Sequence, residues 1–337
     1  MFQGTARAIL TAAVLCLTTG PDAIASGLDL RWATLRTNMT APRVLPDGRV
    51  VDPRGPVFRP VLDGDRLSLE ADDELQQDPF PRPGRLPDGG VAMGRRNIHA
   101  AWLTGPTDRY RHGALGDTIE AGGLAVELKN SVVLRYDLPP DSVFEDLTPR
   151  LADVDGDGSQ EVVVVRSYLA AGAAVMVLKA GPDGLVPLAE SAPIGTANRW
   201  LNPAGVADFD GDGRPEIAVV ETPHIGGVLR LHRLAGNALP VVARKPGFSN
   251  HVLGSRDLGL SAVTDADGDG RPDLVVPDAA RKALRVVAAR DGALVQIALA
   301  PLPRPIASNM AAVDLDGKGG LDVLFALEGG TLAALLF

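Results

Sequence analysis

The chain is short of residues that would cross-link it or supply a thiol. Of its 337 residues only one, Cys16, is a cysteine, so no intrachain disulfide can form. If the segment that contains Cys16 is removed, the mature chain also has no thiol nucleophile.

Long apolar runs are scarce too. Ala8 to Thr19 follows Arg7 and is too short to span a bilayer, and small residues come next at Ala23 to Ala25. The pattern predicts a cleavable export signal over residues 1–25, no transmembrane segment, and a mature protein in the periplasm or outside the cell. A buried N-terminal helix is the alternative interpretation.

The chain also has no excess of positive charge and no recognisable catalytic motif. The formal net charge is −9, which argues against nucleic-acid binding. None of the five histidines stands in a zinc-binding pattern, and no Gly-x-Ser-x-Gly elbow is present. His112 with Asp117, and His251 with Asp257, are pairs that folding could bring together as acid and base. The enzyme question stays open; we favour a non-enzymatic role and keep a hydrolase or lyase as the alternative.

Aspartate, in contrast, recurs in a nine-residue pattern. Segments 153–161, 208–216 and 265–273 each read Asp-x-Asp-Gly-Asp-Gly-x-x-Asp/Glu, and a fourth copy covers 314–322. An apolar β-branched run follows each of the first three, such as Val162 to Val165. Such a run indicates a strand, which excludes the helix-flanked loop of an EF-hand.

These loops suit calcium, because that ion takes six to eight oxygen ligands and would neutralise carboxylates that otherwise repel one another. We expect about three bound Ca²⁺ ions, with ordinary Asp/Gly turns as the alternative. The fourth loop has Lys318 at its fifth position, so we expect that loop to be weak or metal-free. The predicted ligands are Asp153, Asp155, Asp157, Ser159, Glu161, Asp208, Asp210, Asp212, Arg214, Glu216, Asp265, Asp267, Asp269, Arg271 and Asp273, with Ser159, Arg214 and Arg271 acting through backbone carbonyls; Asp314, Asp316 and Asp322 belong to the weak loop.

The spacing of the loops predicts the fold. The first aspartates are 55 (153 to 208), 57 (208 to 265) and 49 (265 to 314) residues apart. A period near 50 residues with several short strands in each repeat is typical of a β-propeller. Between the second and third loops we expect strands at 217–220, 227–234 and 240–244, and the strand that enters the next loop makes four in each blade.

The Asp-rich loops between short strands resemble the FG-GAP/VCBS repeats of integrin-α-type β-propellers in secreted bacterial proteins. The resemblance covers residues 146–337, with degenerate blades over 26–145. It implies an all-β, single-domain propeller with structural calcium in hairpin loops and names no ligand. Six blades are preferred and seven are the alternative. The last repeat is too short for four strands, so we expect a segment such as Leu28 to Leu35 to supply the missing one.

The first half shows two further features. Residues 124–136 read as a plain two-stranded hairpin. Asp72 to Arg96 is rich in proline and glycine, which indicates a surface loop or an irregular connection.

If the loops are scaffold, function belongs elsewhere. The segments that lead into the innermost strands carry side chains suited to recognition, and in a propeller they converge on one mouth of the channel. The candidates are Arg109, Tyr110, His112, Asn198, Arg199, Trp200, Asn202, Asn250, His251, Arg256 and Asp257. Trp200 could stack on a sugar ring or anchor a partner protein. Alternatively, these side chains cap blade ends and satisfy buried backbone. The expectation is a monomeric, calcium-binding propeller whose partner is a protein or a carbohydrate.

Overall fold

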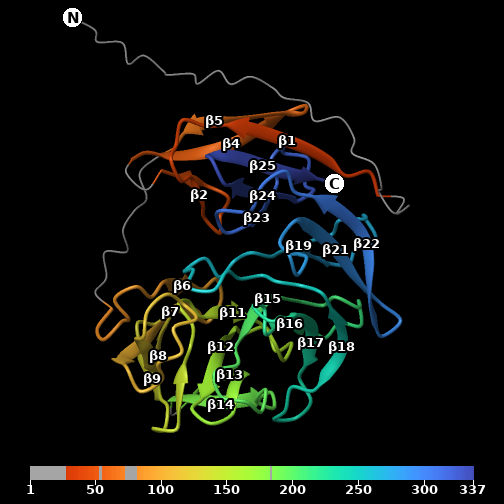
Figure 1. Ribbon diagram of the computed structural model, residues 1–337. Helices are drawn as coiled ribbons and strands as arrows, with labels where there is room; N and C mark the ends of the chain where they lie inside the picture. Colours follow the sequence, from red (N-terminus) through yellow and green to blue (C-terminus); the bar gives the residue numbers. More distant parts are fainter. Residues whose placement is uncertain (1–27, 53–54, 73–81, 183) are drawn as a thin grey trace, which may run out of the picture.

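The computed structural model describes residues 28–52, 55–72, 82–182 and 184–337, so the predicted export signal and Cys16 lie outside it (Figure 1). Throughout these ranges the chain forms β-strands and turns and no helix. The described residues accordingly include no helix that is long and apolar enough to cross a membrane.

The strands form antiparallel sheets, most of them four-stranded, and within the four-stranded sheets consecutive strands are neighbours except where β1 pairs with β25 (Figure 1). One sheet holds β2 (Arg43–Val44), β3 (Val50–Val51), β4 (Val57–Asp63) and β5 (Arg66–Ala71). Another holds β15 (Leu201–Ala207), β16 (Glu216–Glu221), β17 (Val228–Arg233) and β18 (Val241–Pro246), which confirms the three strands expected at 217–244. The next holds β19 (Ala262–Thr264), β20 (Asp273–Pro277), β21 (Ala283–Arg290) and β22 (Ala293–Pro301).

A nine-stranded sheet contains two such four-stranded units. The first is β6 (Val91–Met93), β7 (Ile98–Thr107), β8 (Glu120–Leu128) and β9 (Val133–Asp137); the second is β11 (Arg150–Ala152), β12 (Glu161–Tyr168), β13 (Gly172–Gly181) and β14 (Gly184–Glu190). Strand β10 (Ser142–Phe144) joins them, because it pairs with β12 along its length and with β8 through Phe144. The hairpin expected at 124–136 is confirmed by the pairing of β8 with β9.

The last unit combines the two ends of the chain. Strands β23 (Ala311–Val313), β24 (Asp322–Leu327) and β25 (Thr331–Leu336) are completed by β1 (Arg31–Arg36), which pairs with β25 from Arg31↔Leu336 to Arg36↔Thr331 (Figure 1). This confirms that a strand close to Leu28–Leu35 supplies the missing partner.

Apolar side chains hold consecutive units together. Val163 and Val165 of β12, for example, pack with Ile217 and Val219 of β16. Four further apolar clusters join the other neighbouring units. They lie between β6–β9 and β11–β14, between β15–β18 and β19–β22, between β19–β22 and β23–β25, and between β23–β25 and β2–β5. The described residues give no such cluster between β2–β5 and β6–β9, and the connection between these two units includes residues 73–81, outside the described ranges.

The two ends of the strands carry different features. All four Asp loops join the first strand of a unit to its second: β11 to β12, β15 to β16, β19 to β20 and β23 to β24. Because the strands are antiparallel, the connections from second to third strand, and those between units, lie at the opposite end. The Asp loops and the candidate ligand residues therefore lie at opposite ends of the strands.

Candidate functional site

The Asp loops share one backbone geometry. In the first loop, Asp153 Oδ1 accepts a hydrogen bond from the Gly156 amide (2.8 Å) and Oδ2 accepts one from the Gly158 amide (3.0 Å). Both glycines have φ angles near +80° (76° and 88°), a conformation that glycine adopts without steric cost. The second and fourth loops repeat both hydrogen bonds, and the third repeats the second of them. The fourth loop thus keeps this geometry although Lys318 replaces a carboxylate.

The last carboxylate of each complete loop is buried and fastens the loop to its strand. Glu161 Oε2 accepts from the Val154 amide (2.8 Å), and Glu216 Oε2 accepts from the Phe209 amide (3.0 Å). Burial raises the pKa of both glutamates above the ordinary value. Glu161 Oε1 is buried and has no hydrogen-bond partner among the described residues, although it forms a longer ion pair with Lys179 Nζ at 3.5 Å.

In each complete loop, three carboxylates converge within 4.8 Å of one another. The loops at 153 and 208 bring together positions one, three and nine, and the loop at 265 brings together positions one, three and five. The groups are Asp153, Asp155 and Glu161; Asp208, Asp210 and Glu216; and Asp265, Asp267 and Asp269. Oxygen clusters of this kind suit a hard divalent cation.

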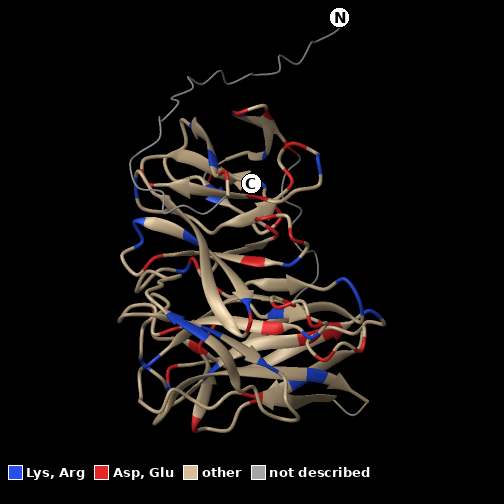
Figure 2. Cartoon of the chain, turned by 90° about the vertical axis from the view of Figure 1, so that its right-hand side faces the viewer, with Lys and Arg blue, Asp and Glu red and all other residues tan. Residues whose placement is uncertain are grey.

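A basic side chain from the third strand of the same unit reaches each cluster. Lys179 Nζ on β13 lies 2.7 Å from Asp157 Oδ2 and 3.5 Å from Glu161 Oε1, and it also contacts Asp155. Arg233 contacts Asp210 and Glu216, and Arg290 contacts Asp267. Figure 2 shows acidic and basic residues interspersed along the chain in this view. The sequence analysis missed these partners, although each stands 23 or 24 positions after the third-position aspartate of its loop.

At the opposite end, a buried polar cluster surrounds Glu145. This glutamate, fully buried beyond the end of β10, accepts from Ser167 Oγ and lies 2.6 Å from His112 Nδ1. His112 Nδ1 therefore carries a proton toward the carboxylate, and in the neutral form of the ring the lone pair lies on Nε2. The side chain of His112 keeps 16% of its surface exposed, whereas that of Glu145 keeps none. The carboxylate that orients His112 is thus Glu145, and Asp117 pairs with Arg256 instead (2.8 Å).

Trp200 lies inside the protein. It is 2% exposed, its Nε1 donates to the Glu145 carbonyl (3.0 Å), and its ring stacks on His224 at 5.9 Å. An indole enclosed in this way offers no face on which a sugar could stack. The structure favours the alternative interpretation for this residue, a capping role.

Two histidines beside Trp200 form a neutral pair. His251 Nε2 donates to the Ser255 carbonyl (3.0 Å), so its Nδ1 accepts from His224 Nε2 at 2.8 Å. Burial, aided by the mutual repulsion of positive charges, lowers the pKa of His224 to about 4, and burial lowers that of His251 to about 4. His251 therefore pairs with His224, while Asp257 pairs with Arg43 (3.1 Å).

Most other candidate ligand residues also satisfy the backbone. Asn202 and Asn250 are fully buried, and each donates its side-chain amide to the other's carbonyl (3.1 and 3.2 Å). Tyr110 is 3% exposed and its hydroxyl accepts from the Asn198 amide (3.1 Å). Arg109 donates to the Ser142 carbonyl (2.9 Å).

Asn198, Arg199, Arg256 and the edge of His112 remain at least partly exposed. Between them, the loop at 252–257 docks on the loop at 113–117, where the Gly254 amide donates to the Ala114 carbonyl (2.9 Å). Two segments that are far apart in the sequence are thus in contact.

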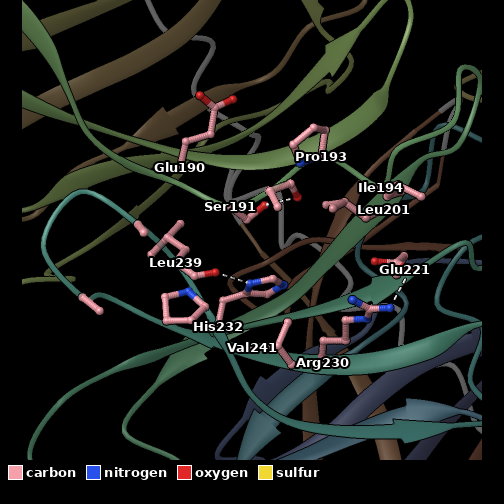
Figure 3. Close-up of a pocket in the computed structure, with 14 residues that line it drawn as sticks. Glu190, Ser191, Pro193, Ile194, Leu201, Glu221, Arg230, His232, Leu239 and Val241 are labelled. Carbon is pink, nitrogen blue, oxygen red and sulfur yellow. Dashed lines mark hydrogen bonds and ion pairs between the residues drawn. The ribbon is translucent and has the colours of Figure 1, made fainter.

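A separate cavity lies between the units β11–β14 and β15–β18 (Figure 3). Its volume is about 390 Å³. The lining is largely apolar, with Glu190, Ser191, Glu221, Arg230 and His232 as its polar side chains.

Comparison with known proteins identifies the repeat. Residues 153–219 match the model of the FG-GAP-like repeat, so the chain carries such a repeat in the segment that holds its first two Asp loops. No curated protein matches the chain.

Solved structures that resemble it are distant. The rhamnogalacturonan lyase YesW shares 15% identity over 60% of this chain and 48% of its own (TM-score 0.39), and the exotype rhamnogalacturonan lyase YesX shares 16% over 86% and 55% (TM-score 0.43). BBS1N, in complex with ARL6DN, shares 11% over 87% and 73% (TM-score 0.41). The chain thus spans about half the length of the two lyases.

Proposed function

Because the chain carries an FG-GAP-like repeat, we propose that residues 26–337 form a single calcium-binding β-propeller that acts as an exported, monomeric binding module. Its six blades would be β2–β5, β6–β9, β11–β14, β15–β18, β19–β22 and β23–β25 with β1. Three observations support this arrangement: units of four antiparallel strands, apolar clusters between consecutive units, and a last unit completed by the first strand.

The chemistry of the Asp loops fits calcium. Each of three clusters offers carboxylate oxygens only, the donors that Ca²⁺ prefers. The observation that carries the proposal is Glu161 Oε1, a buried acceptor of one cluster that receives no hydrogen bond and has only the Lys179 ammonium, 3.5 Å away, to offset its charge. A bound ion would supply positive charge to the cluster. Asp153, Asp155 and Glu161 would hold it in the first loop, so that calcium binding and folding are linked.

Thermal unfolding of the mature protein in EGTA and in millimolar CaCl₂, with bound metal counted by elemental analysis, tests the calcium part. We expect a higher Tm in calcium and about three ions per chain. Asp210→Ala and Asp267→Ala should each lower the Tm in CaCl₂, whereas Lys318→Ala should leave it unchanged. Identical melting in both buffers, with no bound metal, would identify the loops as ordinary turns.

For the binding role we propose that the end of the sheets opposite the Asp loops contacts a protein or carbohydrate ligand. Support comes from the partly exposed polar side chains that gather there: His112, Asn198, Arg199 and Arg256. Arg199 and Asn198 lie on one connection between units, whereas His112 and Arg256 come from two loops that touch each other. A ligand bound there would meet residues of several units at once.

One observation favours a second candidate, a hydrolase or lyase. In the neutral form of the His112 ring, Glu145 selects the tautomer that leaves Nε2 as a base, and the Glu145 side chain is fully buried. Release of reducing ends or unsaturated products from a panel of polysaccharides would reveal such an activity. His112→Asn should then abolish the release without changing the Tm by more than a few degrees. Activity that survives this substitution would exclude His112 as its base.

A further inference from the structure

The cavity between units β11–β14 and β15–β18 contains polar atoms that the fold leaves unused. Its walls include Leu201, Leu239 and Val241, and its volume of about 390 Å³ falls within the range of small-molecule sites. Figure 3 shows His232 in the middle of this lining, with Arg230 and Glu221 beside each other. The question is what chemistry these three side chains present together.

His232 presents an acceptor. Its Nδ1 donates to the Leu239 carbonyl (2.8 Å), so the neutral ring keeps its lone pair on Nε2. Burial lowers the pKa of His232, which keeps the ring neutral at pH 7. In Figure 3 the second ring nitrogen lies on the side that faces Arg230 and Glu221, and the described residues supply no partner for it.

Arg230 presents a donor. Its Nη2 donates to Glu221 Oε1 (2.8 Å), but its Nε is buried and has no hydrogen-bond partner among the described residues. A buried N–H without an acceptor destabilises the folded state, because it loses its hydrogen bond to water. A ligand oxygen in the cavity would remove that cost, so the site favours a molecule that offers an acceptor to Arg230 and a hydrogen to His232.

The charges of the cavity cancel. Arg230 neutralises Glu221, and Glu190 accepts from Arg166 (3.2 Å) and from the Tyr168 hydroxyl (3.0 Å). An anionic or cationic ligand would therefore find no unpaired charge to offset its desolvation. The lining favours a neutral ligand.

We propose that this cavity binds a neutral, hydroxyl-rich small molecule of about monosaccharide size. A hydroxyl group both donates and accepts, so adjacent hydroxyls can satisfy His232 Nε2 and Arg230 Nε together. The C–H face of such a ring would pack on Leu201, Leu239 and Val241. This inference rests on the proposed binding role and assigns to it a second site, apart from the connections around His112.

Two neighbouring valines provide a matched pair of variants. Val241 lines the cavity and is 40% exposed; Val242, next on β18, is 39% exposed and is not part of the lining. Val242 has no partner on β17, because the register of the two strands shifts there, and only Val241 belongs to the lining. Val241→Trp should therefore fill the cavity, while Val242→Trp adds the same surface outside the lining. Arg230→Lys keeps a positive charge for Glu221 and removes the guanidinium group with its Nε donor.

Ligand-detected NMR and calorimetry with neutral monosaccharides (glucose, galactose, mannose and rhamnose), in CaCl₂, test the proposal. At least one sugar should bind the parent and Val242→Trp equally, and binding should weaken at least tenfold in Val241→Trp and in Arg230→Lys. Binding that survives Val241→Trp, tighter binding of the corresponding uronic acids, or no binding by the parent would overturn the proposal. A calcium-dependent Tm without sugar binding would contradict this inference alone, because the calcium part of the proposed function is measured separately.

Discussion

Lys179 Nζ lies 2.7 Å from Asp157 Oδ2 and 3.5 Å from Glu161 Oε1, so the third strand of one unit supplies a positive charge to the Asp loop that precedes it. Hydrogen bonds to Asp155 and Asp157 raise the pKa of Lys179 above its ordinary value, which keeps the ammonium charged at any physiological pH. Asp155 and Glu161 also belong to the cluster that would hold calcium. The ammonium group and a metal ion therefore compete for the same oxygens.

We expect Lys179→Met to have opposite effects in the two buffers. In EGTA it should lower the Tm by a few degrees, because three acidic groups lose a cation. In a calcium titration it should shift the midpoint of the stabilisation to lower calcium, because the ion no longer has to displace the ammonium group. Differential scanning calorimetry across calcium concentrations measures both effects.

Lys318→Met is the control for Lys179→Met. Lys318 also pairs with a loop aspartate, Asp316 (2.7 Å), but its side chain is 81% exposed, so the pair contributes little. An unchanged calcium midpoint in Lys179→Met would show that Lys179 and the ion do not share ligands.

The Asp loops and the strands beside them could be predicted because their signals are local. A nine-residue pattern contains both glycines with positive φ, and the apolar run that follows it pairs as a strand. Burial of single side chains could not be predicted in the same way. Trp200 and His251 stand among polar residues in sequence, but the fold encloses both, because the stacking of units decides which connection is covered.

Contacts between side chains that are far apart in the sequence could not be predicted either. Glu145 lies 33 positions from His112 and forms no motif with it, so no short-range pattern could join them. The basic residues of the Asp loops differ in this respect. Each stands 23 or 24 positions after its loop aspartate. This near-constant spacing could predict the contact once the number of strands in a repeat is known.

The buried Glu120 should make the stability of the protein depend on pH. It is 1% exposed, its Oε1 lacks a hydrogen-bond partner among the described residues, and burial, reinforced by Glu145, raises its pKa to about 9. The folded state thus favours the protonated carboxyl. The stability that this residue contributes is fully present below the unfolded pKa of about 4.5 and is lost as the pH rises toward 9.

Glu120→Gln keeps the shape and removes the titration. The variant should match the parent near pH 4 and exceed it near pH 8, with the difference growing by up to about 1.4 kcal/mol per pH unit. Urea unfolding at several pH values measures the difference, with the exposed Glu328→Gln as control. A difference that is independent of pH would show that Glu120 ionises normally.

The closing strand pair predicts a stability difference between two leucines. Leu335 of β25 is fully buried opposite Trp32 of β1, whereas Leu321 is 42% exposed. Leu335→Ala should lower the free energy of unfolding by about 2–5 kcal/mol, and Leu321→Ala by no more than about 0.5 kcal/mol. Equal losses in chemical unfolding would mean that β1 and β25 do not close a core.

The pairing of β1 with β25 also determines when the protein can finish folding. Strand β1 is synthesised long before β25, its partner in the sheet, where Arg31 is paired with Leu336. Until β25 has left the ribosome, β1 has no partner and the unit that contains it lacks its third strand. Bringing together two segments so far apart in the chain is a slow step. This sheet therefore stays incomplete during synthesis until residues 331–336 are available to β1.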